Sequence, residues 1–146
     1  MHRRMSIGLV CTSLVGLPAC DDTPVDSPQA EMQQRLAGTW LRDYVQDGVR
    51  VRRILVLEPY GGFQEKVRIT DAGVAVTEQT HAGTWFFDGT NLKRKYTSMD
   101  GKQPSAPTVP FATFQIKLPS KNEFVGIDNV HKREVRYQRV EAGTLP

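Results

Sequence analysis

The chain has 146 residues, which is the length of one ordinary domain. It is 39% hydrophobic and 24% charged, with twelve glycines and nine prolines, and this composition excludes both a disordered tail and a bundle of membrane-spanning helices. The formal net charge is only +3.

The first twenty residues have the three parts of an export signal. Arg3 and Arg4 supply a basic start, and residues 5–17 form an apolar run that is too short to span a bilayer. The run ends in Leu17-Pro18-Ala19-Cys20, and two aspartates follow at once. This pattern resembles the signal of bacterial lipoproteins, in which a small residue precedes the cysteine to be modified. The resemblance implies cleavage before Cys20, attachment of diacylglyceryl to its sulfur, and acylation of the new amino terminus with chains such as palmitate.

These expectations place the protein in a bacterial cell envelope, lipid-anchored to a membrane and facing the periplasm. Asp21 resembles the inner-membrane retention signal of enterobacterial lipoproteins. The outer membrane remains an alternative, because that rule does not hold in all bacteria. A second alternative is an ordinary secretory signal cleaved near Ala19, which would leave a soluble protein with a free thiol.

Removal of residues 1–19 changes the charge and the cysteine count. Lys plus Arg falls from 19 to 17 while 16 acids remain, so the net charge falls to +1 and nucleic acid is excluded as an expected partner. Cys11 leaves with the signal and Cys20 carries lipid, so the mature chain keeps no thiol for a disulfide. We therefore expect the domain to be stabilised by its core alone.

The segment after the signal divides into a tether and a short helix. Residues 20–28 are expected to be a lipidated cysteine with a flexible, acidic and proline-containing tether. Residues Pro28–Leu36 suit a helix with Ser27 as N-cap and proline at the first position. Met32 and Leu36 would give this helix one apolar edge, which could plug the end of a barrel.

From Gly38 onward, short apolar runs alternate with turn residues such as Asp47-Gly48 and Asp88-Gly89, which favour hairpins. The candidate strands are Thr39–Gln46, Val49–Glu58, Phe63–Thr70, Val74–Thr80, Gly83–Phe87, Asn91–Ser98, Pro110–Leu118, Glu123–Asp128 and Lys132–Val140. We expect an all-β domain over residues 29–141: an antiparallel meander of eight to nine strands closing into a small barrel, with residues 142–146 as a tail.

Alternation within these strands predicts which side chains face the interior. The expected inner residues are Val49, Val51, Leu55, Leu57, Phe63, Val67, Ile69, Trp85, Phe87, Leu92, Tyr96, Ala112, Phe114, Ile116, Leu118, Val125, Ile127, Val135 and Tyr137.

Gly38-Thr39-Trp40 follows the expected helix, and the last strand reads Val135-Arg136-Tyr137-Gln138-Arg139. In this order the features resemble the lipocalin-like (calycin) domains. The resemblance implies that Trp40 closes one barrel end beneath Arg139, with Gly38 and these two residues forming the closure. The chain is shorter than secreted lipocalins and lacks their disulfide and long C-terminal helix, which argues against a roomy pocket.

Polar residues in apolar register give the main functional signal. Arg53 and Glu65 would meet opposite or diagonally around the turn at residues 59–62, while Arg94 and Arg133 lie in similar register. An unpaired inward charge is costly, so these groups require partners, water or an anionic ligand. With Tyr96 they form the candidate ligand site. The alternatives are a β-bulge at Arg52-Arg53, or arginines that extend outward to solvent.

Catalytic and metal-binding patterns are missing. The mature sequence has two histidines, His81 and His131, with no nucleophile elbow, metal-ligand spacing or phosphate loop. We therefore expect a protein without enzymatic activity, cofactor or metal. We also expect it to be a monomer. Two hypotheses remain: a barrel that binds a small amphipathic or lipid-like ligand, or a filled barrel that serves as an interaction or scaffold module of the envelope. An internal cavity favours the first, and a packed interior with an exposed apolar patch favours the second.

Overall fold

The computed structural model describes residues 27–73, 75–105 and 110–146. The predicted signal, Cys20 and the tether as far as Asp26 lie outside these residues, as does Val74, the predicted start of one strand. Within the described part of the chain, no helix is long and apolar enough to cross a membrane.

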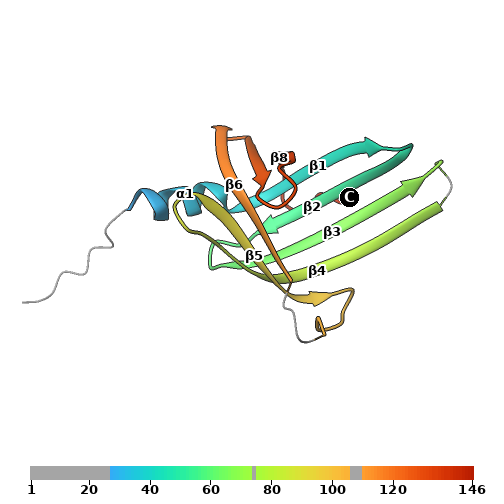
Figure 1. The fold of residues 1–146 in the computed structure, drawn as a ribbon, viewed down its shortest axis with the longest axis horizontal. Coiled ribbons are helices and arrows are strands. Elements are labelled where there is room, and N and C mark those ends of the chain that lie inside the picture. Colours follow the sequence, from blue (N-terminus) through green and yellow to red (C-terminus); the bar gives the residue numbers. More distant parts are fainter. Residues whose placement is uncertain (1–26, 74, 106–109) are drawn as a thin grey trace, which may run out of the picture.

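Eight antiparallel strands form a closed barrel in which each strand pairs with the next along the chain and the last pairs with the first (Figure 1). The all-β meander and its closure are therefore confirmed. The elements are α1 (Pro28–Leu36), β1 (Gly38–Gln46), β2 (Val49–Leu57), β3 (Gly62–Asp71), β4 (Ala75–Phe87), β5 (Asn91–Met99), β6 (Phe111–Ser120), β7 (Glu123–Asp128) and β8 (Glu134–Val140).

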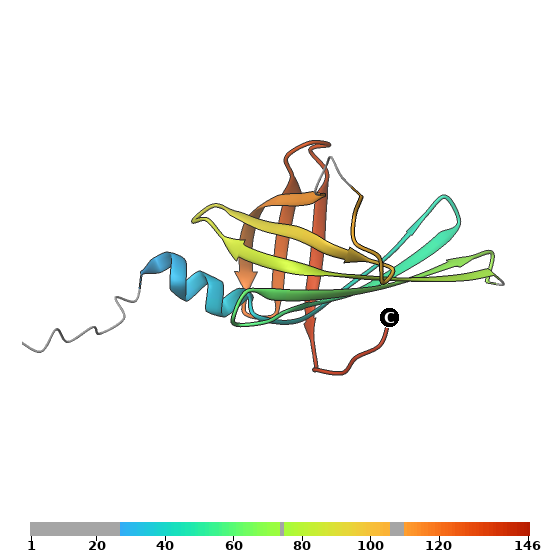
Figure 2. The same cartoon turned by 90° about the horizontal axis from the view of Figure 1, so that it is seen from below.

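The first four strands are longer than the barrel needs. β1 pairs with β8 only over residues 39–41, and β4 pairs with β5 only from His81 onward. The hairpins β1–β2 and β3–β4 therefore project beyond the other strands, away from α1 (Figure 2). We call this part, residues 42–53, 67–73 and 75–80, the extension.

Helix α1 covers one end of the barrel. The Ser27 hydroxyl accepts a hydrogen bond from Ala30 N at 3.1 Å, and Pro28 begins the helix, as the sequence predicts. The Gln29 side chain donates a hydrogen bond to the Phe87 carbonyl, and the Gln33 side chain accepts one from the Phe87 amide. These two hydrogen bonds hold the helix against β4. Leu36 is fully buried, and it carries the apolar edge of the helix into the core.

The two strands predicted around residues 74–87 are one strand, β4. The register shifts between Ala82 and Gly83, so the predicted break is a β-bulge inside a continuous strand. Glycine is required at this point, because a Cβ on Gly83 would collide with the carbonyl of Lys95 and lie 2.8 Å from the Phe63 ring.

Gly83→Ala is expected to lower the free energy of unfolding by roughly 1–3 kcal/mol, because the added methyl must displace backbone as well as the Phe63 ring. Urea unfolding followed by far-UV circular dichroism measures the change. Gly73→Ser is not a suitable control, because Gly73 has a φ of +74° and any side chain there would itself be strained. Thr84→Ala is the control, because this neighbouring side chain is exposed and its truncation should have little effect on stability. A Gly83→Ala protein as stable as the parent would contradict this packing.

The predicted inner pair of β7 is only partly confirmed, because Val125 is buried at 6% exposed whereas Ile127 is only partly buried. Phe124, not Val125 or Ile127, belongs to the main core cluster, and its ring stacks on Tyr137 with centroids 4.7 Å apart. The next inward position is Gly126, where a Cβ would lie 3.1 Å from side-chain atoms of both Phe114 and Val135. Because Gly126 has no side chain, the apolar alternation of β7 follows Val125 and Ile127 instead of the row that begins with Phe124.

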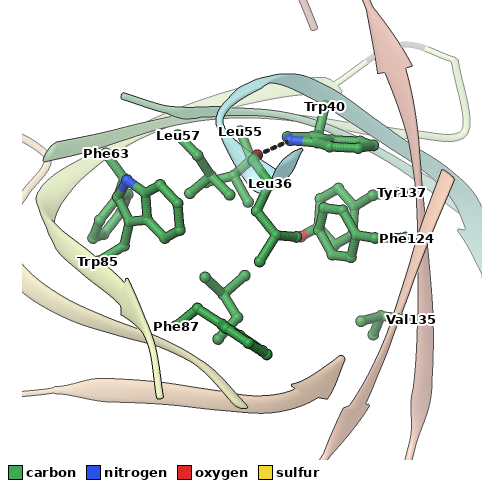
Figure 3. Packing of buried hydrophobic residues seen from close by; sticks show 11 residues of the cluster. Leu36, Trp40, Leu55, Leu57, Phe63, Trp85, Phe87, Phe124, Val135 and Tyr137 are labelled. Carbon is green, nitrogen blue, oxygen red and sulfur yellow. Dashed lines mark hydrogen bonds between the residues drawn. The ribbon is translucent and has the colours of Figure 1, made fainter. Parts of the chain in front are cut away.

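The core lies at the α1 end and is rich in aromatic side chains (Figure 3). Its buried members are Leu36, Trp40, Leu55, Leu57, Phe63, Trp85, Phe87, Leu92, Phe124, Val135 and Tyr137. Each such side chain contributes roughly 1.5–3 kcal/mol when fully buried. The cluster fills this end of the barrel with side chains.

Candidate functional site

Trp40 is the centre of the closed end. It is fully buried, its Nε1 donates to the Leu36 carbonyl at 2.8 Å, and its ring meets the Phe124 ring edge-on at 4.8 Å (Figure 3). The guanidinium carbon of Arg139 lies 4.1 Å from the centre of the Trp40 ring. This is the contact that the lipocalin resemblance implies, and Trp40 and Arg139 are also direct register partners between β1 and β8.

Arg139 also joins two separate segments of backbone, the end of α1 and the turn between β6 and β7. Its guanidinium donates to the carbonyls of Ala37 at 2.9 Å, Lys121 at 2.8 Å, and Arg35. Gly38 has φ +138° and a Cβ there would collide with this guanidinium, so glycine is needed for the close approach. The three closure residues thus form one packed unit.

Three of the four charged residues predicted to face inward form a buried ion cluster, which we define as Arg53, Glu65 and Arg94. Glu65 Oε1 accepts from Arg94 Nη1 at 3.0 Å, and Oε2 accepts from Arg53 Nη1 at 3.4 Å. Glu65 and Arg94 are only 1% and 4% exposed, whereas Arg53 is 28% exposed. The cluster therefore reaches from the core toward solvent through Arg53.

The register explains how β2 and β3 position their part of this cluster. Leu55 lies opposite Glu65 and Arg53 opposite Val67, so Arg53 and Glu65 are diagonal neighbours on the inner face. Pairing runs without a shift through Arg52 and Arg53, so the alternative of a β-bulge at this point is excluded. The inward position of Arg53 is thus a property of the regular sheet.

Arg94 is surrounded by aromatic rings. Its guanidinium carbon lies 5.4 Å, 5.5 Å and 5.7 Å from the ring centres of Phe63, Tyr96 and Phe114. Such contacts stabilise a desolvated cation. Burial, more than any charge, raises the pKa of Tyr96 to about 12, so this ring stays neutral beside the cation.

The cluster carries more positive than negative charge. Burial by itself would raise the pKa of Glu65, but the charges of Arg94 and Arg53 outweigh it and the pKa of this carboxyl is lowered. Glu65 is therefore ionised, and one carboxylate faces two guanidinium groups. An excess of one positive charge remains, and the more exposed partner, Arg53, carries it toward solvent.

Three nitrogen atoms around the cluster are buried without a hydrogen-bond partner in the described structure: Nε of Arg53, Nε of Arg94 and Nδ1 of His81. His81 lies directly opposite Glu65 across β3 and β4. Sequence reasoning noted His81 but did not place it in the site, because the predicted strand break fell at this residue. A continuous strand through residue 81 would have shown its inward register.

Arg133 does not join the cluster. It lies exposed in the turn before β8, where its carbonyl accepts a hydrogen bond from Asp128 N at 2.9 Å. The strand predicted to begin at Lys132 begins instead at Glu134. Lys132 has φ +56°, a turn conformation, and this ends the alternation that would have turned Arg133 inward.

A hollow of about 310 Å³ lies beside Tyr96. Its lining comprises Lys95, Tyr96, Thr97, Gln103 and Pro104. Small-molecule sites usually span roughly 300–1,000 Å³, so this hollow is at the small end of that range. None of the three cluster residues lines the hollow, but Tyr96 does, and its ring also lies beside the Arg94 guanidinium.

No family model matches the sequence, and no curated protein matches it either. Among the described residues, no group of three or more His, Cys, Asp or Glu side chains could hold a metal ion.

Proposed function

We propose that the protein is a membrane-anchored lipoprotein of the bacterial envelope, whose lipocalin-like barrel faces the periplasm and binds a small amphipathic anion without catalysing a reaction. The ligand's carboxylate or phosphate would bind Arg53 at the barrel opening. Tyr96 and the hollow beside it would receive the adjoining apolar part. The anchor is Cys20, whose context resembles a lipoprotein signal.

The excess cation of the buried ion cluster carries this proposal. A guanidinium has several N–H donors arranged to bind carboxylate or phosphate through two parallel hydrogen bonds. Arg53 uses Nη1 for Glu65 at 3.4 Å and has no partner for Nε, while 28% of its side chain is exposed. Among the described residues its Nε therefore retains an unused donor, and part of its side chain is accessible to solvent.

The filled end of the barrel limits how much of a ligand can be enclosed. The closed end is filled by the core around Trp40, Phe124 and Tyr137, so a long tail has no room there. The proposed ligand consequently has a short or partly solvent-exposed apolar tail. This agrees with a domain shorter than the secreted lipocalins.

The filled core also favours a second candidate, an interaction or scaffold module with no small ligand. Its supporting observation is the presence of large exposed apolar side chains on the outside, including Tyr60 at 99%, Val130 at 81% and Phe111 at 64%. This module would bind another envelope protein and would not depend on Arg53.

Two titrations distinguish the ligand-binding protein from the interaction module. The full chain, purified from membranes in a neutral detergent, is titrated with octanoate and with octyl glucoside. Octanoate should bind in a calorimetric titration and the uncharged glucoside should not. Arg53→Ala removes a hydrogen bond to a charged group, worth about 1.5–3 kcal/mol, and should weaken octanoate binding roughly 10–100-fold.

Arg136→Ala is the matched control, because this exposed arginine pairs with Glu123 and Glu134 far from the cluster. It should leave octanoate binding unchanged. Equal affinities of the parent and Arg53→Ala, or no octanoate binding at millimolar concentration, would remove the ligand hypothesis and leave the interaction module. The intact mass of the same sample reports separately whether Cys20 carries acyl chains.

A further inference from the structure

A row of charged residues crosses the outer face of the extension. In register across four strands, Asp43 lies opposite Arg52, Arg52 opposite Arg68, and Arg68 opposite Glu78. Like charges directly opposite one another destabilise a sheet pair. The Arg52–Arg68 pair in the middle of the row therefore needs an anion near it.

The acidic side chains at the ends of this row neutralise the pair only in part, because Asp43 forms an ion pair with Arg52 that it shares with Arg50. Arg50 takes both carboxylate oxygens of Asp43, with Nε to Oδ1 at 3.0 Å and Nη2 to Oδ2 at 2.7 Å. Arg52 Nε is 3.5 Å from Asp43 Oδ2 without a hydrogen bond, and this buried nitrogen has no partner. Across residues 27–73, 75–105 and 110–146, no carboxylate forms an ion pair with Arg68.

These arginines share a hollow of about 240 Å³, which is lined by Arg50, Arg52, Arg68, Thr70 and Pro146. Pro146 is present because the tail after β8 turns back, with the amide and hydroxyl of Thr144 both donating to the Glu141 carbonyl. The C-terminus then lies over β2 and β3 in one view and on the outer side of the sheet in the other (Figures 1 and 2). The tail supplies one wall of the hollow.

We propose that this hollow is a binding site for an oxyanion of the phosphate class, separate from the site at Arg53. Three guanidinium groups and a threonine hydroxyl surround it, and among the described side chains Asp43 is the one carboxylate in an ion pair with them, held by Arg50 at 2.7 Å and by Arg52 at 3.5 Å. Planar guanidinium groups match the oxygens of a phosphate. Bound between Arg52 and Arg68, such an anion would relieve their repulsion and supply a partner for Arg52 Nε. Its source is either free phosphate or the headgroup of an anionic phospholipid.

The test uses the full chain in neutral detergent at constant ionic strength, with inorganic phosphate as the first probe. Phosphate should bind in a calorimetric titration, and Arg68→Gln should weaken that binding at least tenfold. Arg68→Lys keeps the charge but loses the fork of donors, so its affinity should lie between those of the parent and Arg68→Gln. Arg136→Gln, which changes an arginine outside both proposed sites, should bind phosphate as the parent does.

Vesicles distinguish the two sources. If the ligand is a lipid headgroup, the chain should bind vesicles of phosphatidylcholine with one quarter phosphatidylglycerol more tightly than phosphatidylcholine alone, and Arg68→Gln should abolish the difference. If phosphate binds and this difference is missing, the ligand is a free phosphate compound. The proposal is overturned if neither probe binds, or if Arg68→Gln binds both as the parent does while its circular dichroism spectrum shows a native fold.

Discussion

Replacement of Trp40 by alanine is expected to lower the free energy of unfolding by about 3–5 kcal/mol, the usual cost of truncating a buried tryptophan. Trp40 is fully buried and contributes to the closed end in three ways. The change removes the edge contact with Phe124, the hydrogen bond to Leu36 and the ring beneath Arg139. It also leaves a cavity between α1 and the barrel.

Urea unfolding followed by far-UV circular dichroism measures this loss. Trp40→Phe retains a ring but not the Nε1 donor, so its stability should fall between those of the parent and Trp40→Ala. Tyr60→Ala truncates an aromatic side chain that is 99% exposed and should change stability by no more than about 0.5 kcal/mol. A Trp40→Ala protein that unfolds at the same urea concentration as Tyr60→Ala would show that this end is not packed as described.

Glu65→Gln is expected to cost about 3–5 kcal/mol, because it leaves the guanidinium of Arg94 buried without its counter-charge. The double variant Glu65→Leu with Arg94→Met should recover most of that loss, since a buried pair can often be replaced by apolar side chains at little cost. Thermal and urea unfolding of the three proteins measure both effects. Glu134→Gln is the control, because this half-exposed carboxylate in an ion pair with Arg136 should contribute no more than about 1 kcal/mol.

The carboxylate of Glu65 also makes the free energy of unfolding depend on pH. The pKa of Glu65 is lowered in the folded protein from its ordinary value of 4.5, so the folded state binds this proton less readily than the unfolded state. The stabilisation is therefore fully present above pH 4.5 and is lost as the pH falls through the folded pKa. Glu65→Gln should lose less stability than the parent between pH 5 and pH 3. Parallel pH profiles for the two proteins would contradict an ionised Glu65.

Local patterns were sufficient to predict the strands and most turns. Asp47 and Gly48 have φ of 53° and 81°, the conformation that Asp-Gly favours in a two-residue hairpin. Sequence patterns were insufficient where a long-range contact replaces a local signal. The bulge at Gly83 depends on the carbonyl of Lys95, and the empty inward position at Gly126 depends on Phe114 and Val135. None of these partners is adjacent in sequence.

The candidate site likewise has one part that local sequence predicts and another that depends on long-range strand pairing. The diagonal approach of Arg53 and Glu65 follows from counting residues around one turn, and the structure has that geometry. Arg94 reaches the same carboxylate from 29 residues away, through the pairing of β4 with β5, which alternation alone cannot specify. The row of Arg52 and Arg68 likewise requires the register of four strands, and the contribution of Pro146 requires the path of the tail.

The closure of the barrel between β1 and β8 rests on three register pairs, against nine between β1 and β2. A boundary held by so few backbone hydrogen bonds separates at a lower free-energy cost than the others. When the chain fluctuates, the cylinder therefore opens lengthwise at this line first, and water then reaches the indole. Arg139, through its bonds to Ala37 and Lys121, limits how often that happens.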